Sequence, residues 1–579
     1  MELSGAEIVI ESLKKEKVDL VFGYPGGVVI PTYDVIQRTS GIKHILVRHE
    51  QGATHMADGY ARATGKPGVV LVSSGPGATN TVTGIATAFM DSIPMIVITG
   101  QVPVHLIGND AFQESDTVGI TRPITKHNFL IKETEDIARI IAEAFQIATT
   151  GRPGPVLIDL PKDVQVGVAE FCYPERAEIR GYKPKTNGHP IQIRKAAEML
   201  TSAKKPVIYV GGGAIIAEAS DEIRLLARKL NAPVTTTLMG LGAYPENDPL
   251  SLKMLGMHGT WYANTAVMEC DLLVCIGARF DDRVTGNLDE FSPNSKKIHI
   301  DIDPSSLNKN VRVDLPIVGD VKKVLEQLIP MVERADTNEW LLAIENWKIE
   351  HPLTYQNTNT VHEEGMGSNI DNKEDETSIK LPLHAQYAIK KIGEMTNGSA
   401  LVVTDVGQHQ MWAAQWYGFS NPRSMITSGG LGTMGFGLPA AIGAQFAYPD
   451  RDVIVFSGDG SIQMNIQEMA TAVACQLPIK IILLNNGYLG MVRQWQDLFY
   501  DRRYSEVDLR ETNPDFVKLA EAYGAVGLRV FKDEDIENAW QDACKIKDRP
   551  VLLDMVIAEE ENVYPMIPAG AASHEMIEE

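Results

Sequence analysis

The sequence predicts an α/β protein made of three doubly wound parallel-sheet domains. Short runs rich in β-branched residues alternate with helical patterns through most of the chain, which is typical of parallel sheets covered by helices. The length of 579 residues corresponds to about three or four domains. Hydrophobic residues make up 44% and charged residues 22%, close to the averages of globular proteins, so each domain can bury a core.

The first two predicted domains cover residues 1–185 and 186–345. Their apolar runs end in a small polar residue or glycine, as buried parallel strands do where a loop begins. A polar connector at 173–190 separates the two domains, and a helix opens the second. The predicted strands are 68–74, 94–99 and 155–160, then 206–213, 271–277 and 297–301.

A linker is predicted at residues 346–380, before a third domain at 381–579. Its segment 354–379 is polar and has few side chains able to bury area, so we expect it to be exposed and mobile. The strands predicted for the third domain are 400–405, 452–457, 480–485 and 551–554.

The charge balance excludes several classes of protein. With 53 Lys plus Arg against 75 Asp plus Glu, the net charge of −22 argues against nucleic acid or an anionic membrane as a partner.

The cysteines and the N-terminal residues bear on the cellular location. The five cysteines are scattered without CxxC spacing, which favours neither a disulfide framework nor a zinc site. Residues 1–11 carry acids where a targeting peptide is basic, and no stretch of about 18 apolar residues follows. We expect a cytoplasmic protein.

The most informative motif joins two predicted strand ends. Strand 452–457 leads into Gly458-Asp459-Gly460-Ser461, a helical stretch follows at 465–475, and strand 480–485 leads into Asn486, 28 positions after Gly458. Parallel strands bring both ends to one edge of the sheet. Asp459, Asn486 and the backbone carbonyl of Tyr488 are oxygen donors suited to Mg²⁺, and the glycines allow a diphosphate to approach. Either motif alone would be better explained as an ordinary turn.

This spacing resembles the metal and diphosphate motif of thiamine-diphosphate enzymes. Glu50 after His49 matches the family glutamate that hydrogen-bonds the aminopyrimidine ring, although alone the two would form a surface pair. A carboxyl group on that ring can relay general acid-base catalysis through the cofactor. Gly430, Gly432 and Gly435 form a G-x-G-x-x-G, but the strand that a dinucleotide site requires is short and mixed here. In the resemblance, Met434 instead holds the cofactor bent.

Nearly the whole chain is similar to the catalytic subunits of the acetohydroxyacid synthase family. The segments that carry the resemblance are 100–103, 110–114, 151–156, 277–286 and 490–496. The resemblance implies that pyruvate is decarboxylated and its hydroxyethyl group ligated to a second pyruvate or to 2-ketobutyrate, giving precursors of the branched-chain amino acids. It implies pyrimidine-binding, central FAD-binding and diphosphate-binding domains, with thiamine diphosphate, Mg²⁺ and FAD as cofactors.

The resemblance also assigns residues. The pocket residues that it implies are Phe112, Gln113, Lys126 and Met491, with Arg283 and Trp495 for the second keto acid. Its diphosphate turn comprises Val406, Gly407, Gln408 and His409. The implied flavin contacts are Gly211, Gly212, Gly213, Leu255, Gly256, Met257, His258, Gly277, Arg279, Asp301, Ile302, Asp320 and Val321.

Arg283 and Trp495 also fit acceptor recognition on chemical grounds. A guanidinium can bind a carboxylate bidentately, and an indole face offers apolar contact to an acyl chain. The alternatives are that Arg283 pairs with Asp281 or Asp282 and that Trp495 is simply buried.

The resemblance makes a homodimer or homotetramer the expected assembly, because the cofactor of the family lies between domains of two chains. A regulatory small subunit is a possible partner, and the small-molecule partners are 2-keto acids. Two rival hypotheses stay open, a flavin-dependent pyruvate oxidase and a non-catalytic binding subunit, although Glu50, Gln113, Asp459 and Asn486 speak against the latter.

Overall fold

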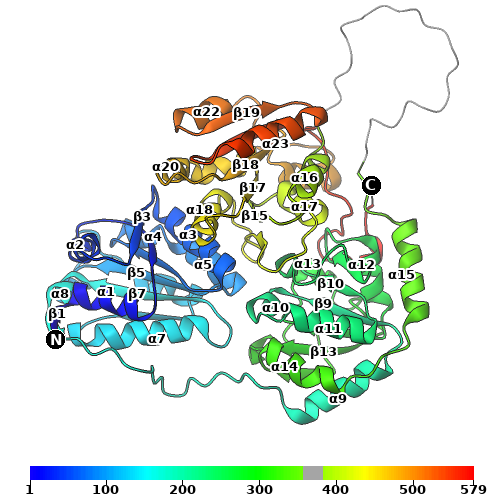
Figure 1. The fold of residues 1–579 in the computed structure, drawn as a ribbon, viewed down its shortest axis with the longest axis horizontal. Helices are drawn as coiled ribbons and strands as arrows, with labels where there is room; N and C mark the ends of the chain where they lie inside the picture. The colour runs from blue at the N-terminus through cyan, green and yellow to red at the C-terminus, as the bar shows by residue number, and fades with distance from the viewer. Residues whose placement is uncertain (356–382, 579) are drawn as a thin grey trace, which may run out of the picture.

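The computed structural model describes residues 1–355 and 383–578, which form three α/β units (Figure 1). Each unit is built on a six-stranded parallel sheet with helices packed against it. The predicted fold class is therefore confirmed, and every strand predicted from the sequence is present.

The first sheet has the strand order β3-β2-β4-β5-β7-β6. Its central strands β4 and β5 are buried along their whole length, which explains why their sequences are continuously apolar rather than alternating. The strands are β2 (Leu20–Tyr24), β3 (Lys43–Leu46), β4 (Gly68–Val72), β5 (Met95–Gln101), β6 (His127–Leu130) and β7 (Pro155–Pro161), with an antiparallel pair β1 (Glu2–Ser4) and β8 (Val168–Glu170) beside them. The helices are α1 (Gly5–Lys15), α2 (Ile30–Arg38), α3 (Glu50–Thr64), α4 (Pro76–Thr79), α5 (Val82–Asp91), α6 (Thr117–Thr121), α7 (Ile137–Thr149) and α8 (Lys162–Val166).

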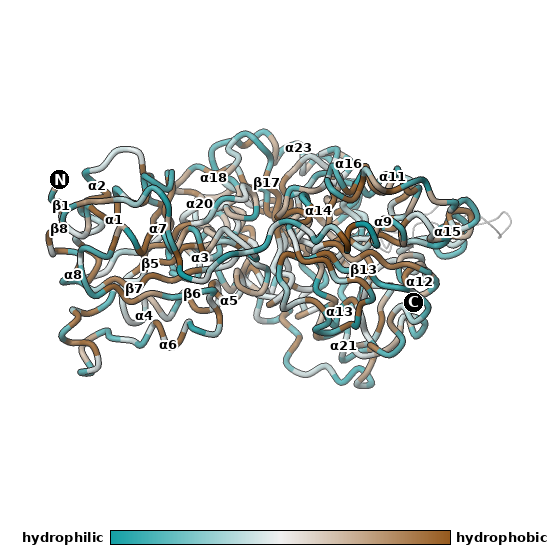
Figure 2. Tube along the Cα trace, turned by 90° about the horizontal axis from the view of Figure 1, so that it is seen from below, coloured by the Kyte–Doolittle hydropathy of each residue, from teal (hydrophilic) through white to brown (hydrophobic). Residues whose placement is uncertain are grey.

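The central sheet has the order β11-β10-β9-β12-β13-β14. Figure 2 shows apolar segments along buried strands, such as β5 and β7 of the first sheet, with hydrophilic segments towards the outside. The strands are β9 (Pro206–Val210), β10 (Val234–Thr236), β11 (Ser251–Met254), β12 (Leu272–Ile276), β13 (Lys296–Asp301) and β14 (Leu315–Val318). The helices are α9 (Pro190–Ser202), α10 (Gly212–Ile216), α11 (Ser220–Leu230), α12 (Trp261–Glu269), α13 (Asp282–Thr285), α14 (Val321–Leu328) and α15 (Asn338–Glu350).

The third sheet has the order β16-β15-β17-β18-β20-β19. The predicted helical stretch 465–475 begins as a 3₁₀ helix (Gln463–Glu468) that is kinked at Asn465. The strands are β15 (Leu401–Thr404), β16 (Met425–Ile426), β17 (Val453–Gly458), β18 (Lys480–Asn485), β19 (Val526–Val530) and β20 (Val551–Val556). The helices are α16 (Ala385–Met395), α17 (Gln408–Trp416), α18 (Gly437–Ala447), α19 (Asp459–Ile462), α20 (Met469–Ala474), α21 (Gly490–Phe499), α22 (Phe516–Ala522) and α23 (Ile536–Lys545).

The predicted linker is only partly described. Helix α15 extends to Glu350, into the first part of the range 346–380. Residues 356–380, which hold the expected mobile segment, lie outside the described residues.

Helices α3 and α18 cross at close range and join the first unit to the third. A Cβ at Gly59 would lie 2.1 Å from the carbonyl oxygen of Ala440, and a Cβ at Gly443 would lie 1.9 Å from that of Met56. Only glycine fits at these two positions, so the backbones can touch. The apolar core accordingly runs from the first sheet through this crossing into the third.

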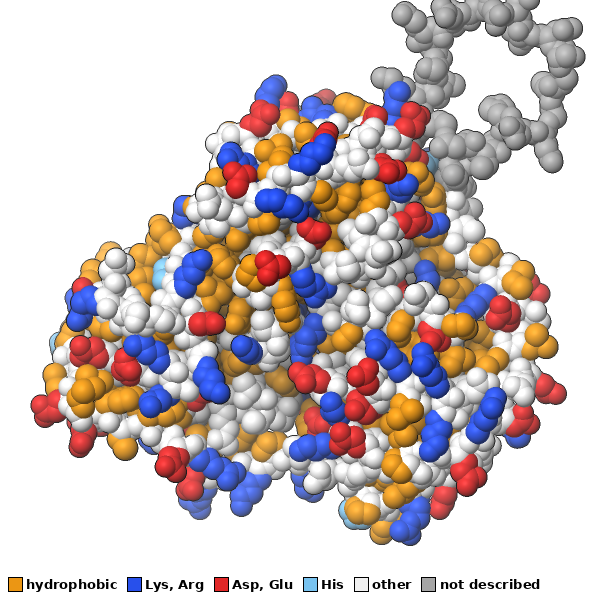
Figure 3. All heavy atoms as spheres, viewed as in Figure 1, with side chains coloured by type: hydrophobic (Ala, Val, Ile, Leu, Met, Phe, Trp, Pro, Cys, Tyr) orange, Lys and Arg blue, Asp and Glu red, His pale blue; other side chains and the backbone are white. Residues whose placement is uncertain are grey.

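The outer surface is mixed in charge. Figure 3 shows basic and acidic side chains interspersed over the viewed face. Within the described ranges, no helix is both long enough and apolar enough to cross a membrane.

Candidate active site

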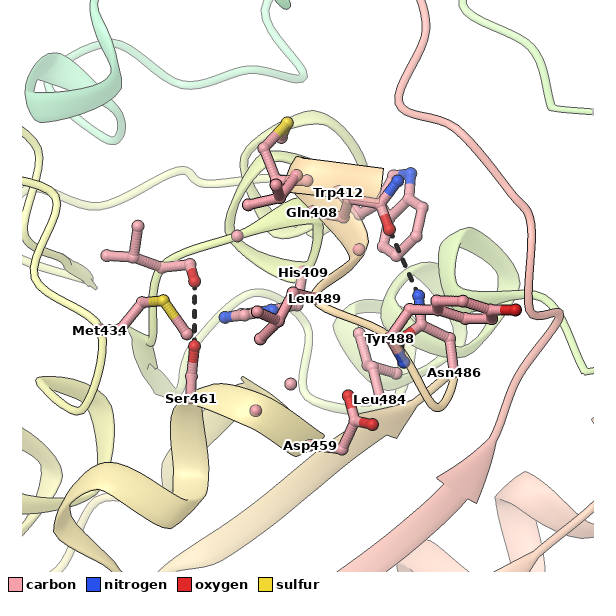
Figure 4. Close-up of a pocket in the computed structure, with 17 residues that line it drawn as sticks. Gln408, His409, Trp412, Met434, Asp459, Ser461, Leu484, Asn486, Tyr488 and Leu489 are labelled. Carbon is pink, nitrogen blue, oxygen red and sulfur yellow. Dashed lines mark hydrogen bonds between the residues drawn. The ribbon is translucent and has the colours of Figure 1, made fainter. Parts of the chain in front are cut away.

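A small cavity lies at the carboxyl edge of the third sheet, where strands β17 and β18 end side by side (Figure 4). Its volume is about 60 Å³. Because β17 ends at Gly458 and β18 at Asn485, the two predicted motifs meet there. The predicted residues on its wall are Val406, Gly407, Gln408, His409, Met434, Gly458, Asp459, Gly460, Ser461, Asn486, Tyr488 and Met491.

The donors at this edge fit a divalent cation. The Asp459 carboxylate is 1% exposed and accepts a hydrogen bond from Asn513 Nδ2 at 2.7 Å. Burial raises the pKa of Asp459 to about 6, and a bound cation would offset that cost of burying a charge. Asn486 Oδ1 accepts from Tyr488 N at 3.1 Å and keeps a second lone pair. A single carboxylate with amide and carbonyl oxygens suits Mg²⁺ that shares phosphate oxygens.

The neighbouring turn fits a diphosphate. His409 is buried, and burial lowers the pKa of its imidazole to about 3, so the ring is neutral. Its Nε2 has no hydrogen-bond partner among the described residues, so it is available to a ligand. Gly458 is needed beside it, because a Cβ there would lie 2.9 Å from His409 Nδ1. Ser461 Oγ donates to the carbonyl of Val406 at 3.0 Å and ties the two turns together (Figure 4).

Sequence reasoning missed Asp405, which organises this turn. Its buried carboxylate accepts from Gly435 N at 2.7 Å and from Val406 N at 3.1 Å. Burial raises the pKa of Asp405 to about 6. The available signal was an acidic residue directly after a continuously apolar strand.

A second cavity of about 1390 Å³ adjoins the first and extends between the three domains. It shares Met434, Met491 and the Val406–Gly407 turn with the small cavity. Its volume exceeds the roughly 300–1000 Å³ typical of drug-sized ligands and fits a dinucleotide. The predicted residues on its wall are Gly211, Gly212, Gly213, Leu255, Met257, His258, Gly277, Arg279, Arg283, Asp301, Ile302, Asp320, Val321, Gly432 and Trp495.

Two details of this wall differ from a simple flavin-contact set. Gly256 does not line the cavity, and its N–H donates to Asn264 Oδ1 at 2.8 Å. Gly211 is required by loop packing itself, because a Cβ there would lie 2.4 Å from the carbonyl oxygen of Gly277. Wall residues that the sequence did not single out include Arg152, Met239 and Asn310.

Arg283 and Trp495 come from helices α13 and α21 and face the same large cavity. Arg283 Nε lies 3.7 Å from Asp282 Oδ2, and the side chain is 59% exposed, so its ion pair is weak. Trp495 is half-buried, with its ring centroid 5.4 Å from that of Phe499. Both side chains therefore remain available to a ligand.

The first-domain candidates gather around a different turn. Glu50 begins α3, and its Oε2 accepts from Asn80 Nδ2 at 2.9 Å. Gln113 has φ +60°, and its Cα lies 3.0 Å from where a Cβ of Gly75 would stand. Phe112 beside it is 88% exposed. None of Glu50, Phe112 and Gln113 lines either of the two cavities of the same chain.

Lys126 lines neither of the two cavities. Its ammonium donates to the carbonyls of Ile147 and Thr150 at the end of α7, and to Tyr182 Oη at 3.2 Å. Burial and the neighbouring Arg152 lower the pKa of Lys126 to about 8. The ammonium of Lys126 is thus engaged by groups of the first domain.

The G-x-G-x-x-G loop binds a side chain of the first domain. Asp91 accepts from Gly429 N at 3.0 Å and from Gly430 N at 2.8 Å, and it pairs with Arg62 at 2.9 Å. The strand before the loop is only Met425–Ile426. Two amides at the start of this loop, those of Gly429 and Gly430, are therefore used in a contact between domains.

Comparison with known proteins agrees with this architecture. Three family models match in order, the N-terminal TPP binding domain (residues 3–120), the central domain (193–328) and the C-terminal TPP binding domain (405–555) of thiamine pyrophosphate enzymes. The fold and site thus define a thiamine-diphosphate-dependent enzyme.

Relatives over the whole length narrow the family. The chain is 51% identical to the acetolactate synthase large subunit of Haemophilus influenzae, over 100% of this chain and 98% of the relative. It is 49% identical to that of Mycobacterium tuberculosis, over 99% and 91%, and 48% identical to the isozyme 3 large subunit of Escherichia coli, over 99% and 98%. The chain belongs to the family of acetolactate synthase large subunits.

Proposed function

We propose that this protein decarboxylates pyruvate and ligates the hydroxyethyl group to a second pyruvate or to 2-ketobutyrate. The products are 2-acetolactate and 2-aceto-2-hydroxybutyrate, precursors of valine, leucine and isoleucine. The observation that carries the proposal is one continuous space in which Arg283 and Trp495 face the cavity that also reaches Met434, Met491 and the diphosphate turn. A carboxylate-binding cation and an apolar face beside a thiamine-diphosphate site suit a 2-keto acid acceptor.

The groups described above support the proposal of three cofactors. Thiamine diphosphate, when bound, supplies the electron sink that decarboxylation of a 2-keto acid needs. Asp459, Asn486 and the Tyr488 carbonyl would hold Mg²⁺, while His409 and Ser461 would bind the diphosphate. FAD would occupy the large cavity, with Arg279 at a phosphate and Asp301 at a hydroxyl or amine. We expect the FAD to be structural.

Each remaining candidate has one task. The Glu50 carboxyl would hold or release a proton at a ring nitrogen of the aminopyrimidine. Gln113 would orient the reacting group through its amide, with Phe112 and Met491 excluding water. Arg283 would hold the acceptor carboxylate and Trp495 would contact its acyl chain. Lys126 has its ammonium engaged by carbonyls, so we assign it the support of the 150–153 turn beside the flavin cavity.

Assembly of two chains would complete the site. Glu50 and Gln113 line neither cavity of their own chain, and Phe112 next to them is exposed, which supports a homodimer or homotetramer in which one first domain faces the third domain of its partner. Sedimentation with parallel activity measurement tests this, and an active monomer would contradict it. The relatives named as large subunits support a regulatory small subunit as a partner. A cytoplasmic location stays a prediction.

Product analysis tests the activity itself. Purified protein is given pyruvate, thiamine diphosphate, Mg²⁺ and FAD, products are followed by NMR, and oxygen uptake is recorded in the same tube. We expect acetolactate with little oxygen consumed. Acetate or acetyl phosphate with stoichiometric loss of oxygen would contradict the proposal and indicate a pyruvate oxidase with redox-active flavin.

A further inference from the structure

We infer that Gln494 is a positioning residue that orients the metal ligand Asn486 through the side chain of Gln408. The inference rests on the metal site of the proposed function. It concerns three buried amide side chains that lie in a row from helix α21 to the end of strand β18. A side-chain amide has an oxygen end and a nitrogen end of similar shape. Hydrogen bonds to neighbouring groups must therefore determine which end faces a cation.

The backbone of Val563 fixes the first amide. Gln494 is completely buried, and its Nε2 donates to the carbonyl of Val563 at 3.1 Å while its Oε1 accepts from Val563 N at 2.8 Å. A backbone N–H can only donate and a backbone carbonyl can only accept. Gln494 therefore has one allowed orientation, with its oxygen towards Gln408.

The oriented Gln494 in turn fixes the orientation of the Gln408 amide. Its Nε2 donates to Gln494 Oε1 at 2.9 Å and to the carbonyl of Glu561 at 2.8 Å. With its nitrogen engaged on that side, its Oε1 faces Asn486 and accepts from Asn486 Nδ2 at 3.4 Å (Figure 4). A rotated Gln408 would place two oxygens, Gln408 Oε1 and Gln494 Oε1, against each other.

Asn486 is the last residue of this hydrogen-bonded row of three amides, Gln494, Gln408 and Asn486, which we call the relay. Because its Nδ2 is bound by Gln408, its Oδ1 is held on the opposite side, where it accepts from Tyr488 N at 3.1 Å and offers a lone pair to a cation. Without the relay, the amide can turn and present its NH₂ group, which cannot bind Mg²⁺. Groups that orient a metal ligand typically contribute about 10-fold to 100-fold in metal affinity.

The first test is direct binding of MgCl₂, measured by calorimetry on the full-length holoenzyme assembly with saturating thiamine diphosphate. We expect Gln494→Met to weaken Mg²⁺ binding by about tenfold or more. The matched control is Gln496→Met on the same helix, whose amide bonds to the backbone of Ser505 at 3.0 and 3.1 Å. Its Mg²⁺ affinity should stay within about twofold of the original.

Two further variants separate orientation from folding. Gln494→Glu, which is neutral when buried, can donate its O–H to the Val563 carbonyl and accept from Val563 N and Gln408, so it should retain Mg²⁺ binding. In an Asn486→Asp background, the ligand is a carboxylate with two equivalent oxygens and no orientation to lose. There we expect Gln494→Met to have no penalty on Mg²⁺ affinity, a non-additivity that a loss of packing would not produce.

The outcomes are distinct. Unchanged Mg²⁺ binding in Gln494→Met, or the same penalty in the Asn486 and Asp backgrounds, would overturn the relay while leaving the metal site intact. Failure of the original protein to bind Mg²⁺ with thiamine diphosphate would overturn the metal site of the proposed function, and the relay with it.

Discussion

The two halves of the proposed cofactor site differ in how completely one chain builds them. In the third domain, the side chains of Asp459 and Asn486 are buried at the cavity and held by hydrogen bonds from the same chain, and the buried His409 lines the same cavity. In the first domain, Glu50 is half-buried and Gln113 is exposed, and neither residue lines either of the two cavities. The comparison supports the proposal that the diphosphate half is preorganised within one chain, whereas the acid-base half would be enclosed by a second chain.

The largest expected effect comes from the open half. Glu50→Gln should lower kcat by about 10²-fold to 10⁴-fold, because an amide cannot exchange a proton with the aminopyrimidine. The fold should be unaffected, since Glu50 makes its side-chain hydrogen bond to Asn80 and an amide oxygen can accept it equally. Steady-state kinetics with pyruvate measures the loss, and flavin absorbance checks that FAD is retained. Turnover near that of the original protein would remove the assigned role.

The second-largest expected effect concerns a contact between the first and third domains of one chain. Asp91 is buried against Arg62 and the amides of Gly429 and Gly430, so Asp91→Ala leaves several buried groups without partners. We expect a loss of about 3 kcal/mol in the free energy of unfolding.

Urea unfolding with thiamine diphosphate absent measures the Asp91 effect. The matched control is Asp136→Ala, which removes an exposed pair with Arg139 and should change the free energy of unfolding by less than about 1 kcal/mol. Equal effects of the two substitutions would mean that the two domains are not joined through Asp91.

A third, pH-dependent effect lies where the third domain meets the central one. Glu246 Oε2 accepts from Phe419 N at 2.7 Å, while its buried Oε1 has no partner among the described residues. Burial raises the pKa of Glu246 to about 7 from its ordinary 4.5. The folded state therefore favours the protonated acid, so this group's stabilisation is fully present below pH 4.5 and is lost as the pH rises through 7.

Glu246→Gln removes that titration. Between pH 5 and 8 we expect the free energy of unfolding of the original protein to fall by about 2 kcal/mol relative to the variant, a value reduced for partial solvent access. Urea unfolding of both proteins across this range measures the difference. Parallel pH profiles would show that Glu246 does not titrate in the folded protein.

Site residues whose positions depend only on the neighbouring strands in the sequence were predictable. Asp459 and Asn486 follow strand ends, and parallel strands bring such ends together whatever the rest of the fold. The contact of Asp91 with Gly429 was not predictable, because it joins residues far apart in sequence through a loop whose glycines suggested a phosphate. The position of Lys126 on backbone carbonyls and the tight packing of Gly211 on Gly277 likewise depend on tertiary contacts that no local pattern encodes.

The smallest expected effect concerns the large cavity and its wall residue Trp495. Trp495 lines the large cavity from α21. Under the proposed function its indole face would contact the extra methylene that 2-ketobutyrate has relative to pyruvate. Trp495→Leu should reduce the preference for 2-ketobutyrate by about tenfold, roughly 1.4 kcal/mol, while the rate with pyruvate alone changes less. The product ratio with both keto acids in competition measures it.

Phe499→Leu is the matched control for Trp495. It removes the ring packed against Trp495, at a position that does not line the cavity. If both substitutions change the ratio equally, the selectivity arises from the packing of α21 rather than from contact with the acceptor. If only Trp495→Leu changes the ratio, the selectivity arises from direct contact between the acceptor and Trp495, in the diphosphate half of the site.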